Sequence, residues 1–92
     1  MAKRIVLLAS GAGSLVRSVL EAKKHGELDL EIVHVISDRP AKVLDVAAEF
    51  GTPSSLIDYA QFQDRDSWSN ELAQKIASLQ PDLLVSLGFM RI

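Results

Sequence analysis

Hydrophobic positions along this chain change their spacing several times, and each change predicts a different element. Residues 5–9 are continuously apolar and end at Ser10-Gly11, a pattern typical of a strand buried on both faces of a sheet. Over residues 14–25 the apolar positions recur at helical spacing instead, at Leu15, Val16, Val19, Leu20 and Ala22. This second segment is therefore predicted to be a helix with one buried stripe, ended by Gly26.

The same alternation continues to the end of the chain. Strands are predicted over residues 30–36, around 55–57 and over 83–87, because each stretch is short and apolar or lies between turn-forming residues. Pro40 is expected to open a second helix, with Val43, Leu44, Ala47 and Phe50 on its buried face. A third helix is expected from about Asp64 to Pro81, with a stripe of Trp68, Leu72, Ile76 and Leu79.

Strands that alternate with helices in this way predict an α/β fold. We expect a Rossmann-like parallel sheet with right-handed crossovers, strand order 3-2-1-4 and helices on both faces, formed by residues 1–92 as one unit. In such a sheet, ligands bind at the carboxyl ends of the first and fourth strands. Residues 10–14 and 88–92 are therefore predicted to form the two walls of one pocket.

Composition narrows the classes of function. Of the 92 residues, 48% are apolar and 24% are charged, which is typical of a globular domain. The net charge of -2 argues against nucleic acid or an anionic membrane as a partner. The chain has no cysteine, and the apolar run of residues 5–9 is too short for a signal peptide or a membrane span. We therefore expect a cytoplasmic protein.

The loop over residues 10–14, here called the glycine loop, has the composition of an anion site. Gly11 and Gly13 permit backbone conformations and close approaches that a side chain would block. The loop opens a helix, whose unpaired N–H groups and dipole favour a phosphate, and Ser14 could add a donor. The alternative is a simple tight turn. The dinucleotide fingerprint is not complete, because Val16 stands where its third glycine would be.

Other polar residues leave alternatives open. Asp38 and Arg39 could bind the ribose and 2′-phosphate of a dinucleotide, which would make the chain a nucleotide-binding module without catalysis; otherwise they are solvated loop residues. His34 is predicted to be a structural histidine within a strand, and His25 to interact with a helix end. Arg65 opposes the dipole of the helix it begins, which favours either a ligand contact or a solvated surface position.

Three segments together resemble a known family. The stretches IVLLASGAGSL, DRDSW followed by EL, and PDLLVSLGFMRI are similar to the N-terminal half of the phosphoribosylglycinamide formyltransferases, also called GAR transformylases. The resemblance implies transfer of a formyl group from 10-formyltetrahydrofolate to glycinamide ribonucleotide in purine synthesis, without a metal.

The resemblance also implies site residues. Gly13, Ser14 and Leu15 match the positions that hold the substrate phosphate, with Gly11 and Gly88 shaping the two loops. The folate positions match Arg65, Met90, Arg91 and Ile92. Two departures concern the glycine loop, since Leu15 stands where the family often has Asn and Ala12 replaces a commonly polar residue. A phosphate contact at Leu15 would then use its backbone N–H.

The family's catalytic residues fall outside this sequence. Its Asn-x-His-Pro segment and later Asp are expected downstream of Ile92, and neither His25 nor His34 lies on a predicted site loop. We therefore expect no catalytic residue here, a chain that lacks its C-terminal half as partner, and no formyl transfer by residues 1–92 alone. An exposed edge of the fourth strand, beside Phe89, Met90 and Ile92, is a potential template for self-association.

Overall fold

A computed structural model describes residues 3–26 and 30–87 of the chain. Four strands alternate with three α-helices, and a short 3-10 helix, η1 (Tyr59–Gln61), precedes the last of them. The strands are β1 (Lys3–Ala9), β2 (Leu30–Ser37), β3 (Ser54–Leu56) and β4 (Leu83–Leu87). The α-helices are α1 (Ser14–Lys24), α2 (Lys42–Glu49) and α3 (Arg65–Leu79).

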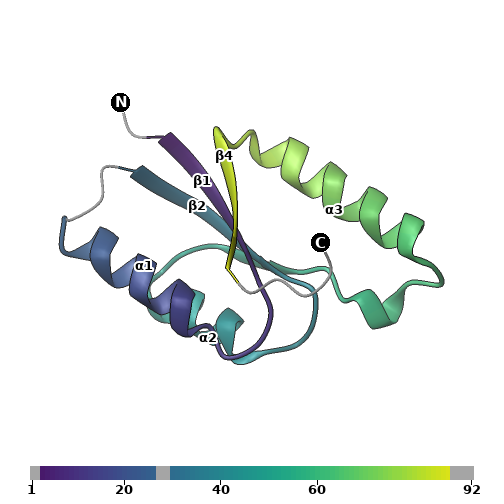
Figure 1. Ribbon diagram of the computed structural model, residues 1–92, viewed down its shortest axis with the longest axis horizontal. Coiled ribbons are helices and arrows are strands. Elements are labelled where there is room, and N and C mark those ends of the chain that lie inside the picture. Colours follow the sequence, from purple (N-terminus) through teal and green to yellow (C-terminus); the bar gives the residue numbers. More distant parts are fainter. Residues whose placement is uncertain (1–2, 27–29, 88–92) are drawn as a thin grey trace.

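The strands form one parallel sheet in the order β3-β2-β1-β4 (Figure 1). The chain starts in the middle of the sheet, moves outward to β3, and returns through α3 to place β4 beside β1. This topology confirms the predicted α/β class and the predicted strand order 3-2-1-4. In register, Ala9 of β1 lies between Ser37 of β2 and Leu87 of β4, so the carboxyl ends of these three strands lie side by side.

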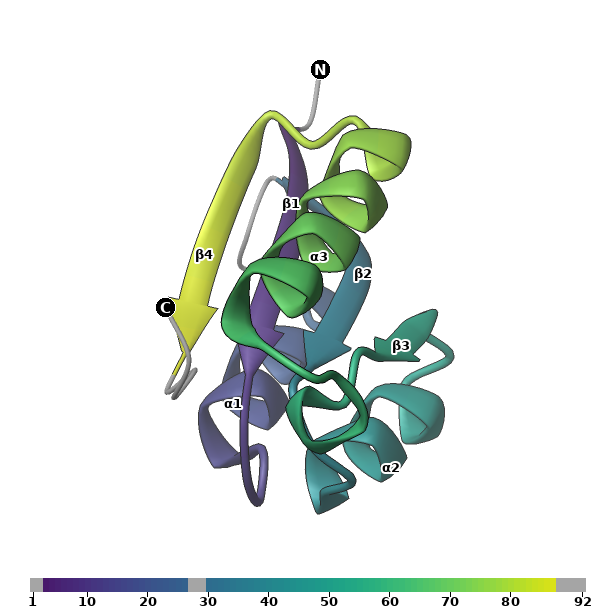
Figure 2. The ribbon, with the colours of Figure 1, turned by 90° about the vertical axis from the view of Figure 1, so that its right-hand side faces the viewer.

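Helices cover both faces of the sheet (Figures 1 and 2). Helices α1 and α2 pack on one face over Ile5, Leu7 and Ala9, and α3 packs on the other over Val6 and Leu8. Strand β1 is buried on both faces because alternate side chains point to opposite helical layers. Its unbroken apolar run in the sequence is explained by this position.

Two details of the predicted helices are wrong. Helix α2 begins at Lys42 rather than at Pro40, because Ala41 is extended with φ -157° and ψ 164°. This later start brings the N–H of Val43 to the carbonyl of Gly11, at 3.1 Å. Leu15, assigned to the buried stripe of α1, is 57% exposed, because it lies on a different side of the helix from the buried residues Val16 and Leu20.

Strand β4 lies at the edge of the sheet, and within the described ranges it pairs with β1 alone. Its first two residues, Leu83 and Leu84, are 52% and 42% exposed. They pair with Ile5 and Val6, which face opposite helical layers, so apolar surface is open on both faces of this strand. Self-association through this edge remains a prediction. Among the helices described, none is both long and apolar enough to cross a membrane.

Candidate functional site

The glycine loop leaves the sheet at the carboxyl end of β1, directly beside the end of β4. Ala9 pairs with Leu87, so the loop begins where the two central strands end. Gly11 has φ +100° and Gly13 has φ +82°, left-handed conformations that side-chain-bearing residues rarely adopt. The turn that carries the chain from β1 into α1 therefore depends on both glycines, as the sequence predicts.

The loop ends at the N-terminus of α1, where the first N–H groups have no acceptor within the helix. Gly13 is the N-cap residue, and its carbonyl accepts the first helical hydrogen bond from Arg17 N at 2.8 Å. No side chain caps this end of α1. Ser14 and Leu15 are both exposed in the first turn. The three residues predicted to contact a phosphate are thus consecutive at a helix end whose dipole favours an anion.

Helix α2 supports the glycine loop from the side. Besides the hydrogen bond from Val43 to Gly11, the two segments touch at Gly13, where an added β-carbon would lie 2.8 Å from the Cα of Val43. Glycine at position 13 therefore allows α2 to pack directly against the loop.

Asp38 is buried, so its assignment to the solvated surface is wrong. The residue is 1% exposed, and its carboxylate accepts hydrogen bonds from the Ser10 hydroxyl at 2.5 Å and from Arg39 Nε at 3.2 Å. Because the side chain is fully covered, its position argues against contact with a ribose. Sequence reasoning missed the pairing with Ser10, although both residues directly follow adjacent strands, which was the available signal.

Arg65 is the first residue of α3 and is exposed, as expected from its place in the sequence. The preceding Asp64 caps the helix, because its carboxylate accepts a hydrogen bond from Ser67 N at 2.7 Å. Hydrogen bonding to Ser67 lowers the pKa of Asp64, which keeps the cap ionised. The other expected folate contacts, Met90, Arg91 and Ile92, lie outside the described residues, as does Gly88.

Neither histidine lies near the glycine loop. His34 is 7% exposed in β2, with its Nε2 hydrogen-bonded to Ser55 Oγ at 2.7 Å. Burial lowers the pKa of His34, and the charge of Lys75 lowers it further, so the ring is neutral near pH 7. His25 follows α1 as its C-cap residue, at the other end of that helix from the loop. Both positions are structural, as predicted.

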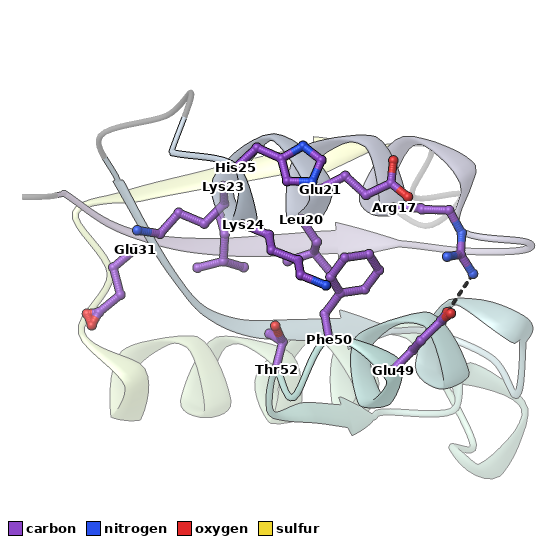
Figure 3. A pocket seen from close by; sticks show the side chains of 11 residues that line it. Arg17, Leu20, Glu21, Lys23, Lys24, His25, Glu31, Glu49, Phe50 and Thr52 are labelled. Atoms are coloured by element: carbon purple, nitrogen blue, oxygen red, sulfur yellow. Dashed lines mark hydrogen bonds and ion pairs between the residues drawn. The ribbon is translucent and has the colours of Figure 1, made fainter.

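Two of the hollows on the described part of the surface lie near α1. The larger, of about 770 Å³, lies away from the glycine loop, between the C-terminal part of α1, the end of α2 and the start of β2 (Figure 3). Its lining mixes charges of both signs, and Arg17 and Glu49 form an ion pair at 2.7 Å across it. The guanidinium of Arg17 and the ammonium of Lys24 lie 5.8 and 6.0 Å from the centre of the Phe50 ring. These contacts join α1 to α2.

The smaller hollow, of about 490 Å³, adjoins the glycine loop itself. Ala12 and Ser14 line it together with Lys42 and Asp45 from the start of α2. A ligand at the loop therefore has space on the α2 side. Among the described residues, no three His, Asp or Glu side chains are grouped as a metal ion would require.

Comparison with known proteins identifies the family. The family model described as "Formyl transferase" matches residues 3–92. The chain therefore belongs to the formyl transferase family. Within this formyl transferase chain, the matched range includes the glycine loop, Arg65 and every element of the sheet.

Relatives and solved structures confirm the resemblance to phosphoribosylglycinamide formyltransferases. The enzyme of that name from Mycobacterium tuberculosis is 42% identical over 89 residues, covering 97% of this chain and 41% of the relative. Its counterpart from Schizosaccharomyces pombe is 37% identical, covering 100% and 49%. The structure of the Coxiella burnetii phosphoribosylglycinamide formyltransferase superposes with a TM-score of 0.94 at 33% identity, covering 100% of this chain and 44% of that one. This formyl transferase chain thus spans less than half the length of these relatives.

Proposed function

We propose that this chain provides the substrate-phosphate part of an enzyme that transfers a formyl group from 10-formyltetrahydrofolate to the amino group of glycinamide ribonucleotide. The observation that carries the proposal is the position of the glycine loop. It joins the carboxyl end of β1, next to β4, to an uncapped helix N-terminus with Gly13, Ser14 and Leu15 in sequence. A phosphate monoester is the ligand group that such a helix end favours.

The phosphate would be held mostly by the backbone. Ser14 can donate its hydroxyl, while Leu15 has no polar side chain and can donate only its N–H. Helix α1 supplies the favourable dipole, and the hydrogen bond from Val43 to Gly11 supports the loop against movement. The names of the relatives agree with a glycinamide ribonucleotide substrate.

The folate would lie on the other side of the pocket. The proposal assigns Arg65, Met90, Arg91 and Ile92 to 10-formyltetrahydrofolate, on the resemblance of their segments to the family. Of these, Arg65 is exposed at the start of α3, and a guanidinium is a suitable group for binding an anion such as a carboxylate. Membership of the formyl transferase family supports a folate-derived formyl donor.

The proposal assigns no catalytic residue to residues 1–92. Attack of the substrate amine on the formyl carbon creates an oxyanion, which needs a hydrogen-bond donor, and the amine proton must pass to the departing folate nitrogen. His34 is buried in β2 and His25 lies at the far end of α1, so neither reaches the glycine loop. The family's Asn, His and Asp would have to come from the C-terminal half of the enzyme.

Isothermal titration of the 92-residue chain tests the binding part. Glycinamide ribonucleotide should bind, while the same compound without its phosphate should bind at least tenfold more weakly. Equal binding of the two compounds would contradict the phosphate assignment. Preferential binding of NADP would instead support the alternative of a nucleotide-binding module. In an assay with both substrates, residues 1–92 alone should give no formyl transfer.

A further inference from the structure

We propose that Ser10 and Asp38 form a positioning pair that sets the conformation of the glycine loop for phosphate binding. The inference rests on the proposed function of that loop. It adds residues that nothing in the family resemblance assigned to the site. Asp38 acts through Ser10, since its side chain is fully covered.

The pair is formed by the geometry of the sheet. Ala9 and Ser37 are register partners at the ends of β1 and β2. The residues that follow them, Ser10 and Asp38, therefore lie together at the carboxyl end of the sheet. There the Ser10 hydroxyl donates a 2.5 Å hydrogen bond to Asp38 Oδ1. Bonds between a hydroxyl and a carboxylate are shorter and stronger than neutral ones. The first residue of the loop is thereby fixed to the neighbouring strand.

Asp38 is itself held in place from several directions. Arg39 donates to it from Nε at 3.2 Å and from Nη2 at 3.4 Å, which balances the buried negative charge. The carbonyl of Asp38 accepts a hydrogen bond from Tyr59 N at 2.9 Å. Because both its side chain and its backbone are bound, the carboxylate is a rigid acceptor. A buried carboxylate that loses a donor is costly, so the bond to Ser10 is strongly favoured.

Ser10 and Gly11 are therefore anchored on two sides. The Ser10 hydroxyl is bound to β2 through Asp38, and the Gly11 carbonyl is bound to α2 through Val43. The rest of the loop follows directly and contains the N–H groups of Gly13 and Ser14. A loop ordered before binding loses less conformational entropy when the ligand arrives. The pair is thus expected to increase affinity without touching the ligand.

Ser10→Ala removes the hydroxyl alone, and Ser10→Thr restores it. Ser78→Ala is the matched control, because its exposed hydroxyl donates to the Lys75 carbonyl within α3, away from the glycine loop. Two measurements apply to all four proteins: hydrogen exchange of the loop amides, and titration with ribose 5-phosphate followed by amide chemical shifts. We expect faster loop exchange and about 5- to 10-fold weaker binding in Ser10→Ala, the effect of one hydrogen bond. Ser10→Thr and Ser78→Ala should match the parent.

The outcomes separate this inference from the proposed function. Unchanged loop exchange in Ser10→Ala overturns the positioning pair. Weaker binding with unchanged exchange would also overturn it, since Ser10 would then contact the ligand directly. If the parent chain shows no response to ribose 5-phosphate, the phosphate function fails and the role of the pair in binding fails with it. The exchange comparison would still establish whether the Ser10 hydroxyl, bound to Asp38, fixes the loop.

Discussion

Gly13 and the backbone of Val43 are in such close contact that a β-carbon at Gly13 would lie 2.8 Å from the Val43 Cα. The glycine loop and the first turn of α2 therefore pack without space for any side chain between them. Because Val43 is fully buried and its N–H is bound to Gly11, it cannot move away easily. This contact links the conformation of the proposed phosphate site to the packing of α2.

Gly13→Ala should destabilise the chain and weaken phosphate binding. The substitution combines the strain of φ +82° with a clash against backbone, for a loss of about 2–4 kcal/mol in the free energy of unfolding. Gly51→Ala is the matched control, since Gly51 has φ +69° but nothing within 4 Å of an added β-carbon. Its loss should be about 1 kcal/mol. Urea unfolding of both variants measures the difference, and equal losses would contradict the contact.

Trp68 joins α3 to the sheet by packing and by a hydrogen bond. Its side chain is 2% exposed, and its Nε1 donates to the Ile57 carbonyl at 2.8 Å. Trp68→Phe should reduce the free energy of unfolding by about 2–4 kcal/mol, because it leaves a cavity and a buried carbonyl that has lost a donor. Ile76→Val, in the same cluster, removes one methyl group and should cost about 1 kcal/mol. Similar losses, measured by circular dichroism in urea, would argue against the role of the indole N–H.

The fold was predictable because its strongest signals are local. The unbroken apolar run of β1 and the apolar stripe of α3 can each be recognised within one segment, and both segments contribute to the core. Details that depend on distant segments were not predictable. Pro40 satisfies the local rules for a helix start, but the bond from Val43 to Gly11 accompanies a start at Lys42.

The candidate site shows the same division. Gly11 and Gly13 could be assigned to the loop from their residue type, because positive φ angles favour glycine. The burial of Asp38 was missed, since an acidic residue after a strand usually lies in a solvated turn. The signal was non-local: its partner Ser10, 28 residues earlier, follows the adjacent strand. The exposure of Leu15 was also missed, because the apolar residues of α1 cover a wider arc of the helix than the face buried at Val16 and Leu20.

His34 should make stability depend on pH. The pKa of His34 in the folded chain is lowered by burial and by Lys75. As the pH falls, the unfolded chain therefore binds a proton at His34 before the folded chain does. This contribution to stability is fully present above the unfolded pKa of about 6.5 and is lost as the pH falls towards the lowered folded value. The melting temperature should decrease between pH 7.5 and pH 5, and this decrease should be smaller in the His34→Gln variant. The exposed His25→Gln serves as control, and an equal pH dependence in both variants would contradict the assignment.

Leu15 offers a test of backbone recognition, because its N–H and its side chain can be altered separately. Leu15→Ala keeps the N–H and removes a side chain that is 57% exposed, so affinity for ribose 5-phosphate should stay within about twofold. Leu15→Pro removes the N–H in the first turn of α1, where proline is tolerated because that group has no partner within the helix. Loss of a charge-assisted hydrogen bond should weaken binding about 10-fold or more.

Two other results would contradict backbone recognition at Leu15. Equal affinity of Leu15→Pro and Leu15→Ala would mean that the N–H of Leu15 does not contact the phosphate. A large loss in Leu15→Ala would mean that the side chain contributes instead, by contact with the rest of the ligand. Thermal unfolding of each variant without ligand separates these effects from instability, since a folded Leu15→Pro chain should retain the melting transition of the parent within several degrees. Under the proposed function, only the proline variant loses binding.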